Sequence, residues 1–109
     1  MLSWEDFKKV EMRVGTILRA SSFPEARNPA FKITIDMGNL GVFKTSAQIT
    51  QLYNVEELVG KQVITVVNFP KKQIANFMSE CLILGVLGDD KDVTLLTPDK
   101  PVKNGSLIG

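Results

Sequence analysis

Hydrophobic and polar residues alternate with a period of two along most of the chain, and this pattern predicts a mostly β protein. The clearest alternation is in Lys32–Met37, where every second residue from Ile33 is apolar and would face the core. Gln62–Val67 and Cys81–Leu87 are rich in β-branched or other apolar residues, and they predict two more buried strands. Weaker strand patterns cover three further segments: Met12–Arg19, Val42–Ser46 and Val93–Leu96.

Turn-forming residues separate these predicted strands. Ser21–Pro29 contains two prolines and predicts a loop, while Gly38-Asn39 and Gly88–Lys91 predict turns. Gly15 lies inside a predicted strand, where a glycine often marks a bend or bulge. The tail from Pro98 onward predicts irregular structure. About five to seven short strands with little helix are typical of a small antiparallel barrel, closed or partly open.

Two short helices are predicted. The first covers Ser3–Lys9, begins at a good N-cap serine, and places Trp4 and Phe7 on one face. Two helical turns are too short to be stable alone, so this face must dock, either on the barrel of its own chain or on a partner subunit. The second helix is a single turn that Asn54 caps and Gly60 ends.

The composition is that of an ordinary globular protein, because 44% of the 109 residues are hydrophobic and 23% are charged. No linker divides the chain, so residues 1–109 are predicted to form one domain. No apolar run approaches the ~20 residues of a membrane span, and the charged N-terminal segment lacks the apolar core of a signal peptide. We therefore expect a cytoplasmic protein. The net charge is only +1, so any basic surface must be a local patch.

Histidine is absent, and Cys81 is the one cysteine. These counts exclude an intrachain disulfide, histidine-based catalytic triads and histidine metal sites. Cys81 starts an apolar strand and has no basic neighbour, so we interpret it as a buried structural thiol. Asp89, Asp90 and Asp92 lack the spacing of a calcium loop and predict a solvated turn. We expect no catalytic residues, no metal and no cofactor, and hence a protein that is not an enzyme.

The segment Asn68–Glu80 is polar and basic, with interleaved apolar side chains. Lysines can pair with phosphates, aromatic rings can stack on bases, and amides or hydroxyls can bond to bases or backbone. The alternative is a solvated connection whose apolar residues cap the barrel. On the first interpretation the candidate tRNA- or peptide-binding residues are Asn68, Lys71, Lys72, Gln73, Phe77 and Ser79.

Further candidates lie outside this segment. Lys44, Ser46 and Gln48 would share one face if the backbone there stays extended, and they could line a ligand groove. The same run equally fits a strand end that caps the next turn. Arg27 and Lys32 would extend a basic surface if the barrel places their loop beside the lysines of Asn68–Glu80.

Short motifs in a fixed order connect the sequence to a known family. They are RVGTI at 13–17, FPEAR at 23–27, SAQIT at 46–50, ELVGKQV at 57–63, VNFP at 67–70, IA at 74–75, SE at 79–80, PDKPV at 98–102 and NG at 104–105. With these motifs the chain resembles the tRNA-binding-domain family, and within it the CsaA-type export-related chaperones. The resemblance runs from about residue 6 to the end of the sequence.

The resemblance implies an OB-fold, a five-stranded antiparallel Greek-key barrel with short helices and with additions at both termini that form a homodimer. Trp4 and Phe7 would then lie in the dimer interface. It also implies a molecular chaperone that binds unfolded or presecretory polypeptides in protein export, together with the capacity to bind tRNA by shape. An alternative is a tRNA-binding protein that acts alone or beside an aminoacyl-tRNA synthetase.

By position, the resemblance implies that Asn68, Lys71, Lys72, Gln73 and Ser79 contact tRNA. The family usually has a basic residue at position 73, so the loss of that charge should lower the salt dependence of binding by about one unit. It usually has glycine at position 76, where asparagine tolerates a positive φ comparatively well.

Overall fold

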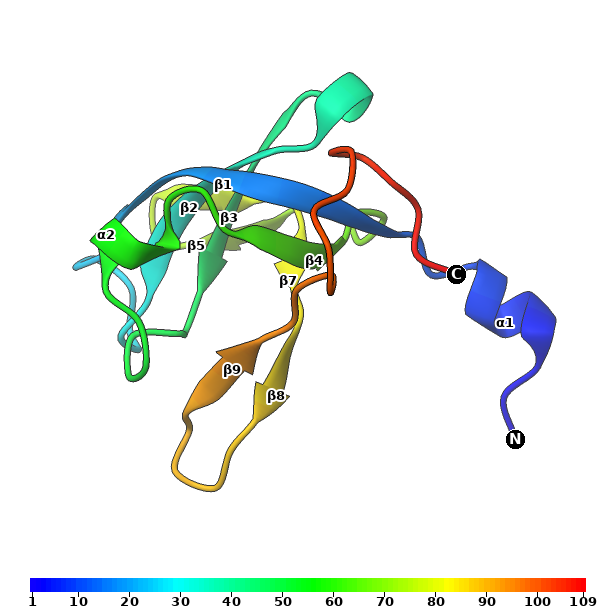
Figure 1. The fold of residues 1–109 in the computed structure, drawn as a ribbon. Helices are drawn as coiled ribbons and strands as arrows, with labels where there is room; N and C mark the ends of the chain where they lie inside the picture. Colours follow the sequence, from blue (N-terminus) through cyan, green and yellow to red (C-terminus); the bar gives the residue numbers. More distant parts are fainter.

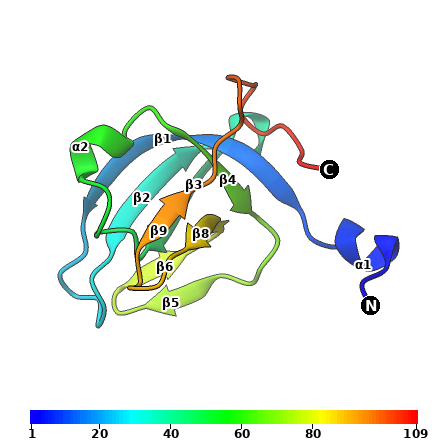
Figure 2. The same ribbon diagram turned by 60° about the horizontal axis from the view of Figure 1, so that its bottom comes forward.

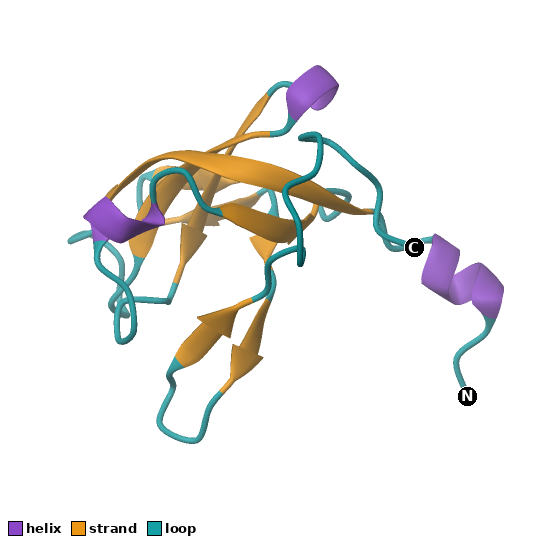
Figure 3. Ribbon diagram, in the orientation of Figure 1, coloured by secondary structure: helices purple, strands orange, loops and turns teal.

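The computed structural model describes residues 1–109, with 39% of the chain in strands and 11% in helices (Figures 1 and 3). The main strands are β1 (Met12–Ser22), β2 (Phe31–Asp36), β3 (Val42–Ala47), β4 (Gln62–Val66) and β7 (Leu82–Ile83). They form one antiparallel sheet in the order β3-β2-β1-β4-β7, which curls into a nearly closed, OB-like barrel. The predictions of a mostly β protein and of an OB-fold are therefore confirmed.

Two hairpins accompany the barrel: β5 (Lys72–Ile74) with β6 (Phe77–Ser79), and β8 (Gly85–Leu87) with β9 (Val93–Leu95). The predicted single strand Cys81–Leu87 is in fact β7 followed by β8. The strand divides at Leu84, whose N–H donates to Ile64 of β4 while its carbonyl accepts from Leu96. The chain therefore changes partner at this residue, and the β8–β9 hairpin projects away from the barrel (Figure 1).

The barrel closes where β3 meets the chain after β6. The backbone N–H of Glu80 donates to the carbonyl oxygen of Lys44 at 2.7 Å, and Thr45 Oγ1 donates to the carbonyl oxygen of Cys81 at 2.6 Å. Figure 2 shows β5 and β6 lying along the bottom of the barrel. These contacts cover part of the free edge of β3, so less of it remains available to pair with another chain.

The core follows the predicted alternation. Ile33, Ile35 and Met37 are all at most 1% exposed and belong to one apolar cluster in the barrel. Leu58, on α2 (Val55–Leu58), is fully buried against the same cluster. The predicted cap of α2 is confirmed, because Asn54 and Glu57 form a reciprocal capping box.

Strand β1 corrects two expectations. The register shift that bends it lies at Leu18, between Ile17 and Arg19, and not at Gly15. Gly15 instead allows close packing, since a Cβ atom there would lie 2.3 Å from Met37 Sδ. The strand also continues through Ser22 into the predicted loop, because its last residues still pair with the start of β2.

The C-terminal tail is irregular, as predicted, but it is bound to β1. The amide of Gly105 donates to the carbonyl of Val14, whose own amide donates to Ser106. Asn104 Oδ1 accepts hydrogen bonds from Thr16 Oγ1 and Gln62 Nε2. The tail thus takes up the part of the β1 edge that β2 does not reach.

The N-terminal helix α1 (Trp4–Lys8) stands apart from the barrel (Figures 1 and 2). Its predicted N-cap is confirmed, because Ser3 Oγ accepts a hydrogen bond from the Asp6 amide at 3.0 Å. None of its residues is buried, and Trp4 is 81% exposed, so the helix does not dock on its own barrel. No helix in the structure has the length and apolarity to cross a bilayer.

Candidate functional site

The basic segment that follows β4 forms a hairpin, β5 with β6, which the sequence analysis did not predict. Lys72 pairs with Ser79, Gln73 with Met78, and Ile74 with Phe77. Gln73 and Met78 are exposed, whereas Ile74 and Phe77 are partly buried. The pleat therefore turns Gln73 and Met78 outward, while Ile74 and Phe77 face the bottom of the barrel.

The turn of this hairpin differs from expectation. The residue with a positive φ is Ala75, at 51°, and not Asn76. Gln73 Nε2 donates to the Ala75 carbonyl oxygen at 3.1 Å, which holds the side chain against its own turn. The left-handed position is thus one residue earlier than the resemblance to the family implied.

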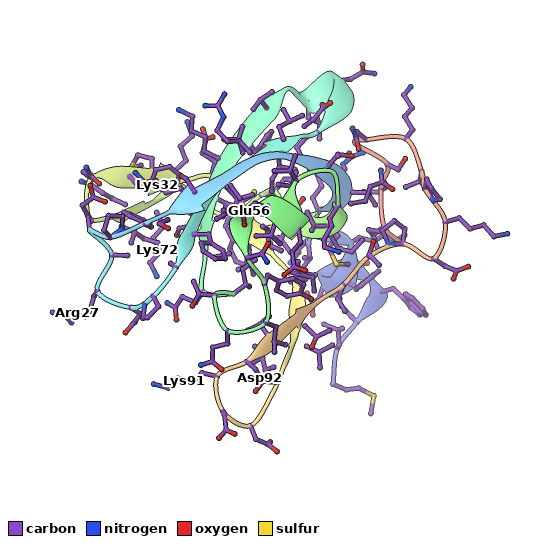
Figure 4. All side chains as sticks on the ribbon, turned by 60° about the vertical axis from the view of Figure 1, so that its left-hand side comes forward. Arg27, Lys32, Glu56, Lys72, Lys91 and Asp92 are labelled. Atoms are coloured by element: carbon purple, nitrogen blue, oxygen red, sulfur yellow. The ribbon has the colours of Figure 1, made fainter.

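An aromatic contact joins the hairpin to the loop after β1. The ring of Phe77 meets the ring of Phe23 edge-to-face at a centroid distance of 5.5 Å. Lys32 Nζ lies 5.1 Å from the Phe23 centroid and 5.9 Å from the Phe77 centroid. In Figure 4, Arg27, Lys32 and Lys72 all lie toward the same side of the molecule. The loop after β1 therefore lies beside the hairpin, which was the condition for Arg27 and Lys32 to extend a basic surface.

The outer surface of the sheet continues this basic region. Across the strands, Arg19 pairs with Thr34, and Thr34 pairs with Lys44. Because the core residues of β2 alternate with these positions, all three side chains face outward. Arg19 was not a candidate from the sequence, since only the register shift at Leu18 brings it opposite Thr34. We call the six cations of this region the basic face: Arg19, Arg27, Lys32, Lys44, Lys71 and Lys72.

The other candidates of the β3 run lie at its end. Ser46 sits opposite Lys32 on the outer surface of the sheet, two residues from Lys44. Gln48 follows the last residue of β3 and is exposed. Lys44 and Ser46 therefore share one strand face, as expected, while Gln48 lies beyond the strand that would have aligned it with them.

The two lysines of the hairpin differ in their surroundings. Lys71 Nζ lies 3.5 Å from Glu80 Oε2, and its side chain is 64% exposed. Lys72 is exposed and has no ion-pair partner. Because exposed ion pairs are worth at most about 1 kcal/mol, Lys71 remains available to a ligand at a small cost.

Two predicted ligand contacts instead bond within the protein. Asn68 accepts a hydrogen bond from the Glu11 amide at 3.0 Å and donates to the Lys9 carbonyl at 2.6 Å. Ser79 Oγ lies 3.0 Å from Thr45 Oγ1 and accepts from the backbone N–H of Ser46 at 3.3 Å. In this structure both side chains hold parts of the fold together.

Cys81 is buried, at 7% exposed, beside these closure contacts. Burial raises the pKa of its thiol to about 12, against the lowering effect of a hydrogen bond with Thr45 and with a small further rise from the charge of Glu80. The thiol is thus protonated at neutral pH and packs as a small apolar group, as the sequence predicted.

The turn between β8 and β9 contains or adjoins Asp89, Asp90 and Asp92. The side chain of Asp92 accepts a hydrogen bond from the backbone N–H of Asp90.

Two groups of exposed apolar side chains lie outside the basic face, one at α1 and one on β8. Leu2, Trp4 and Phe7 line a shallow depression on and beside α1. On β8, Val86 is 58% exposed and Leu87 is 82% exposed. Exposed apolar side chains mark surfaces that bind other macromolecules when they form a contiguous patch.

Comparison with known protein families gives a match over residues 12–107 to the family described as "Putative tRNA binding domain". The chain belongs to this tRNA-binding-domain family. Among curated relatives, a methionine–tRNA ligase of Nanoarchaeum equitans is 36% identical over 108 residues, which are 99% of this chain but 14% of the ligase. The chain thus spans only a small part of the ligases that it matches.

Solved structures agree with this assignment to the tRNA-binding-domain family. The chaperone CsaA of Bacillus anthracis is 47% identical and superposes with a TM-score of 0.96, covering 100% of this chain and 99% of that chain. The CsaA chaperone of Picrophilus torridus is also 47% identical, with a TM-score of 0.93 and complete coverage of both chains. The resemblance that the sequence motifs indicated is therefore confirmed.

Proposed function

We propose that this chain is a CsaA-like molecular chaperone, a non-catalytic homodimer in the cytoplasm that binds unfolded or presecretory polypeptides in protein export. The observation that carries this proposal is the 47% identity to two CsaA chaperones over the whole chain. The exposed apolar side chains support it, because unfolded polypeptides present apolar groups that such surfaces can cover.

We propose the homodimer because α1 does not dock on its own barrel. A helix of five residues does not form stably without packing, yet none of the residues in α1 is buried. Trp4 and Phe7 share a depression that a second copy of the chain could fill. Dimerisation through these residues would bury aromatic surface that otherwise faces water.

The polypeptide site is proposed beside the hairpin. Phe69 is 56% exposed and Met78 is 46% exposed, and both flank or belong to the segment with Lys71 and Lys72. Methionine adapts to differently shaped partners because it is flexible and polarizable. This mixture of apolar and cationic groups suits an extended chain of variable sequence.

A second function, tRNA binding, is supported by the basic face. Arg19 and Lys44 lie across the sheet from each other, and Lys72 has no acidic partner. Cations arranged in this way can pair with successive phosphates without reading base sequence. The family match and the methionine–tRNA ligase relatives favour the same ligand.

The test is to titrate the purified protein with labelled total tRNA at two salt concentrations and, in parallel, to measure how it slows aggregation of an unfolded polypeptide. Lys72→Ala should weaken tRNA binding and reduce its salt slope by about one unit. The matched control is Lys91→Asn, which removes a charge at the β8–β9 turn where φ is 65°, a conformation that asparagine tolerates.

Slowed aggregation with weak tRNA binding would support the chaperone as the main function. Salt-sensitive tRNA binding that Lys72→Ala weakens, with no effect on aggregation, would favour the tRNA-binding alternative. Failure in both assays would contradict both proposals.

A further inference from the structure

Glu80 occupies a special position on the basic face. Its Oε1 accepts a hydrogen bond from the Lys44 backbone N–H at 2.8 Å, and its Oε2 lies 3.5 Å from Lys71 Nζ. The side chain is 27% exposed, much less than the 64% of Lys71. One carboxylate therefore performs two tasks: one oxygen helps to hold β3 to the chain after β6, and the other neutralises a cation.

The structure has three ion pairs, and the Lys71–Glu80 pair is the one that involves the basic face. A phosphate that approaches Lys71 must displace Glu80 or accept repulsion from it. The carboxylate cannot easily move away, because Oε1 and the backbone of Glu80 are both bonded to Lys44. The negative charge is thus fixed among the cations.

We propose that Glu80 is a specificity-determining residue. It restrains Lys71 and so disfavours the phosphate backbone of tRNA relative to unfolded polypeptide. The proposal rests on the proposed tRNA binding by the basic face. A fixed negative charge lowers the affinity for negatively charged tRNA, and it removes no contact that an unfolded polypeptide could make. A polypeptide of near-zero net charge has no reason to be repelled by this carboxylate.

The decisive variant is Glu80→Gln, because the amide oxygen can still accept from the Lys44 N–H while the charge is lost. The matched control is Glu56→Gln, which changes the net charge equally at an exposed position on α2 (Figure 4). The double variant Lys71→Gln/Glu80→Gln asks whether any gain depends on Lys71. Thermal melting of each variant reports whether the barrel closure survives.

We expect Glu80→Gln to bind labelled total tRNA about threefold to tenfold more tightly at low salt, with a salt slope steeper by about 0.7 to 0.9. Glu56→Gln should match the wild type, and the double variant should lose the gain. Binding of an unfolded polypeptide of near-zero net charge should not change. Tighter tRNA binding by Glu80→Gln where the wild type shows none would also support the proposal.

Equal tRNA binding by Glu80→Gln and Glu56→Gln would overturn the inference, and so would a gain that persists in the double variant. Weaker binding together with a lower melting temperature would also overturn it, because the charge would then be needed for closure. If neither the wild type nor Glu80→Gln binds tRNA, tRNA binding itself fails. If the wild type binds and Glu80→Gln shows no gain, this inference alone fails.

Discussion

The side-chain amide of Asn68 donates to the carbonyl oxygen of Lys9 at 2.6 Å, which ties the end of β4 to the end of α1. The same amide accepts a hydrogen bond from the backbone of Glu11, where the chain enters β1. Asn68 also stands immediately before the residues that lead into the hairpin. The proposed dimer helix and the proposed ligand hairpin are therefore connected through one side chain.

Asn68→Ala should destabilise the fold by about 1 kcal/mol, because two backbone groups lose their partner but can turn to water. Hydrogen exchange should accelerate most at Glu11 and in α1, which a urea titration alone would not reveal. Asn28→Ala, an exposed asparagine in the loop after β1, serves as the control and should leave both unchanged. Exchange at Glu11 as slow as in the wild type would show that this connection does not hold the helix.

Gly15→Ala should lower the free energy of unfolding because it overpacks the core. The new Cβ would lie 2.3 Å from Met37 Sδ and 2.5 Å from Ile35 Cγ2, both in the core. Inserting a methyl group into a packed core costs about 1–3 kcal/mol in the free energy of unfolding. Urea denaturation of Gly15→Ala, Met37→Ala and the double variant should show coupling, since the smaller side chain makes room. Strictly additive effects would mean that the clash is relieved elsewhere.

Local sequence patterns predicted the elements whose stability is local. The alternation in Lys32–Met37 marks β2 because one face of that strand is buried. The cap at Asn54 marks α2 because both of its hydrogen bonds join residues three apart. These features needed no knowledge of the rest of the chain.

The candidate site was less predictable because its contacts are distant in sequence. Phe77 packs against Phe23 and so holds the β5–β6 hairpin to the barrel. Its strands have only three residues each, which is too few for a clear alternation of polar and apolar residues. Glu80 belonged to a family motif, but its partner Lys44 is on another strand. The side chains of Asn68 and Ser79 have the chemistry of ligand contacts, and only the fold shows which backbone groups they bind instead.

Cys81 makes stability depend on pH in the alkaline range. Its pKa is raised from the ordinary 9.0 to about 12 in the folded protein, so the unfolded state loses its proton first. The stabilising effect is complete below pH 9 and is lost as pH rises toward 12, at about 1.4 kcal/mol per pH unit. Urea titrations between pH 8 and about 10.5 should therefore show a steeper loss than in Cys81→Ala. Parallel pH profiles would show that the thiol ionises freely in the folded protein.

The exposed aromatic face of α1 gives the last prediction. Trp4→Ala with Phe7→Ala should weaken the proposed homodimer about a hundredfold or more, since aromatic anchors carry much of the energy of small interfaces. Sedimentation over a range of protein concentrations should then show a shift from dimer toward monomer. The barrel should stay folded, because neither residue belongs to its core.

Leu40→Ala is the matched control, because Leu40 is 43% exposed on the 3-10 turn Gly38–Leu40, outside α1. Its loss removes apolar surface without touching the proposed interface. An unchanged dimer in the Trp4/Phe7 variant would place the interface elsewhere, and the exposed β8 residues Val86 and Leu87 would be tested next. A wild-type protein that is monomeric at all concentrations would remove the homodimer from the proposed function while leaving the basic face as the site for tRNA.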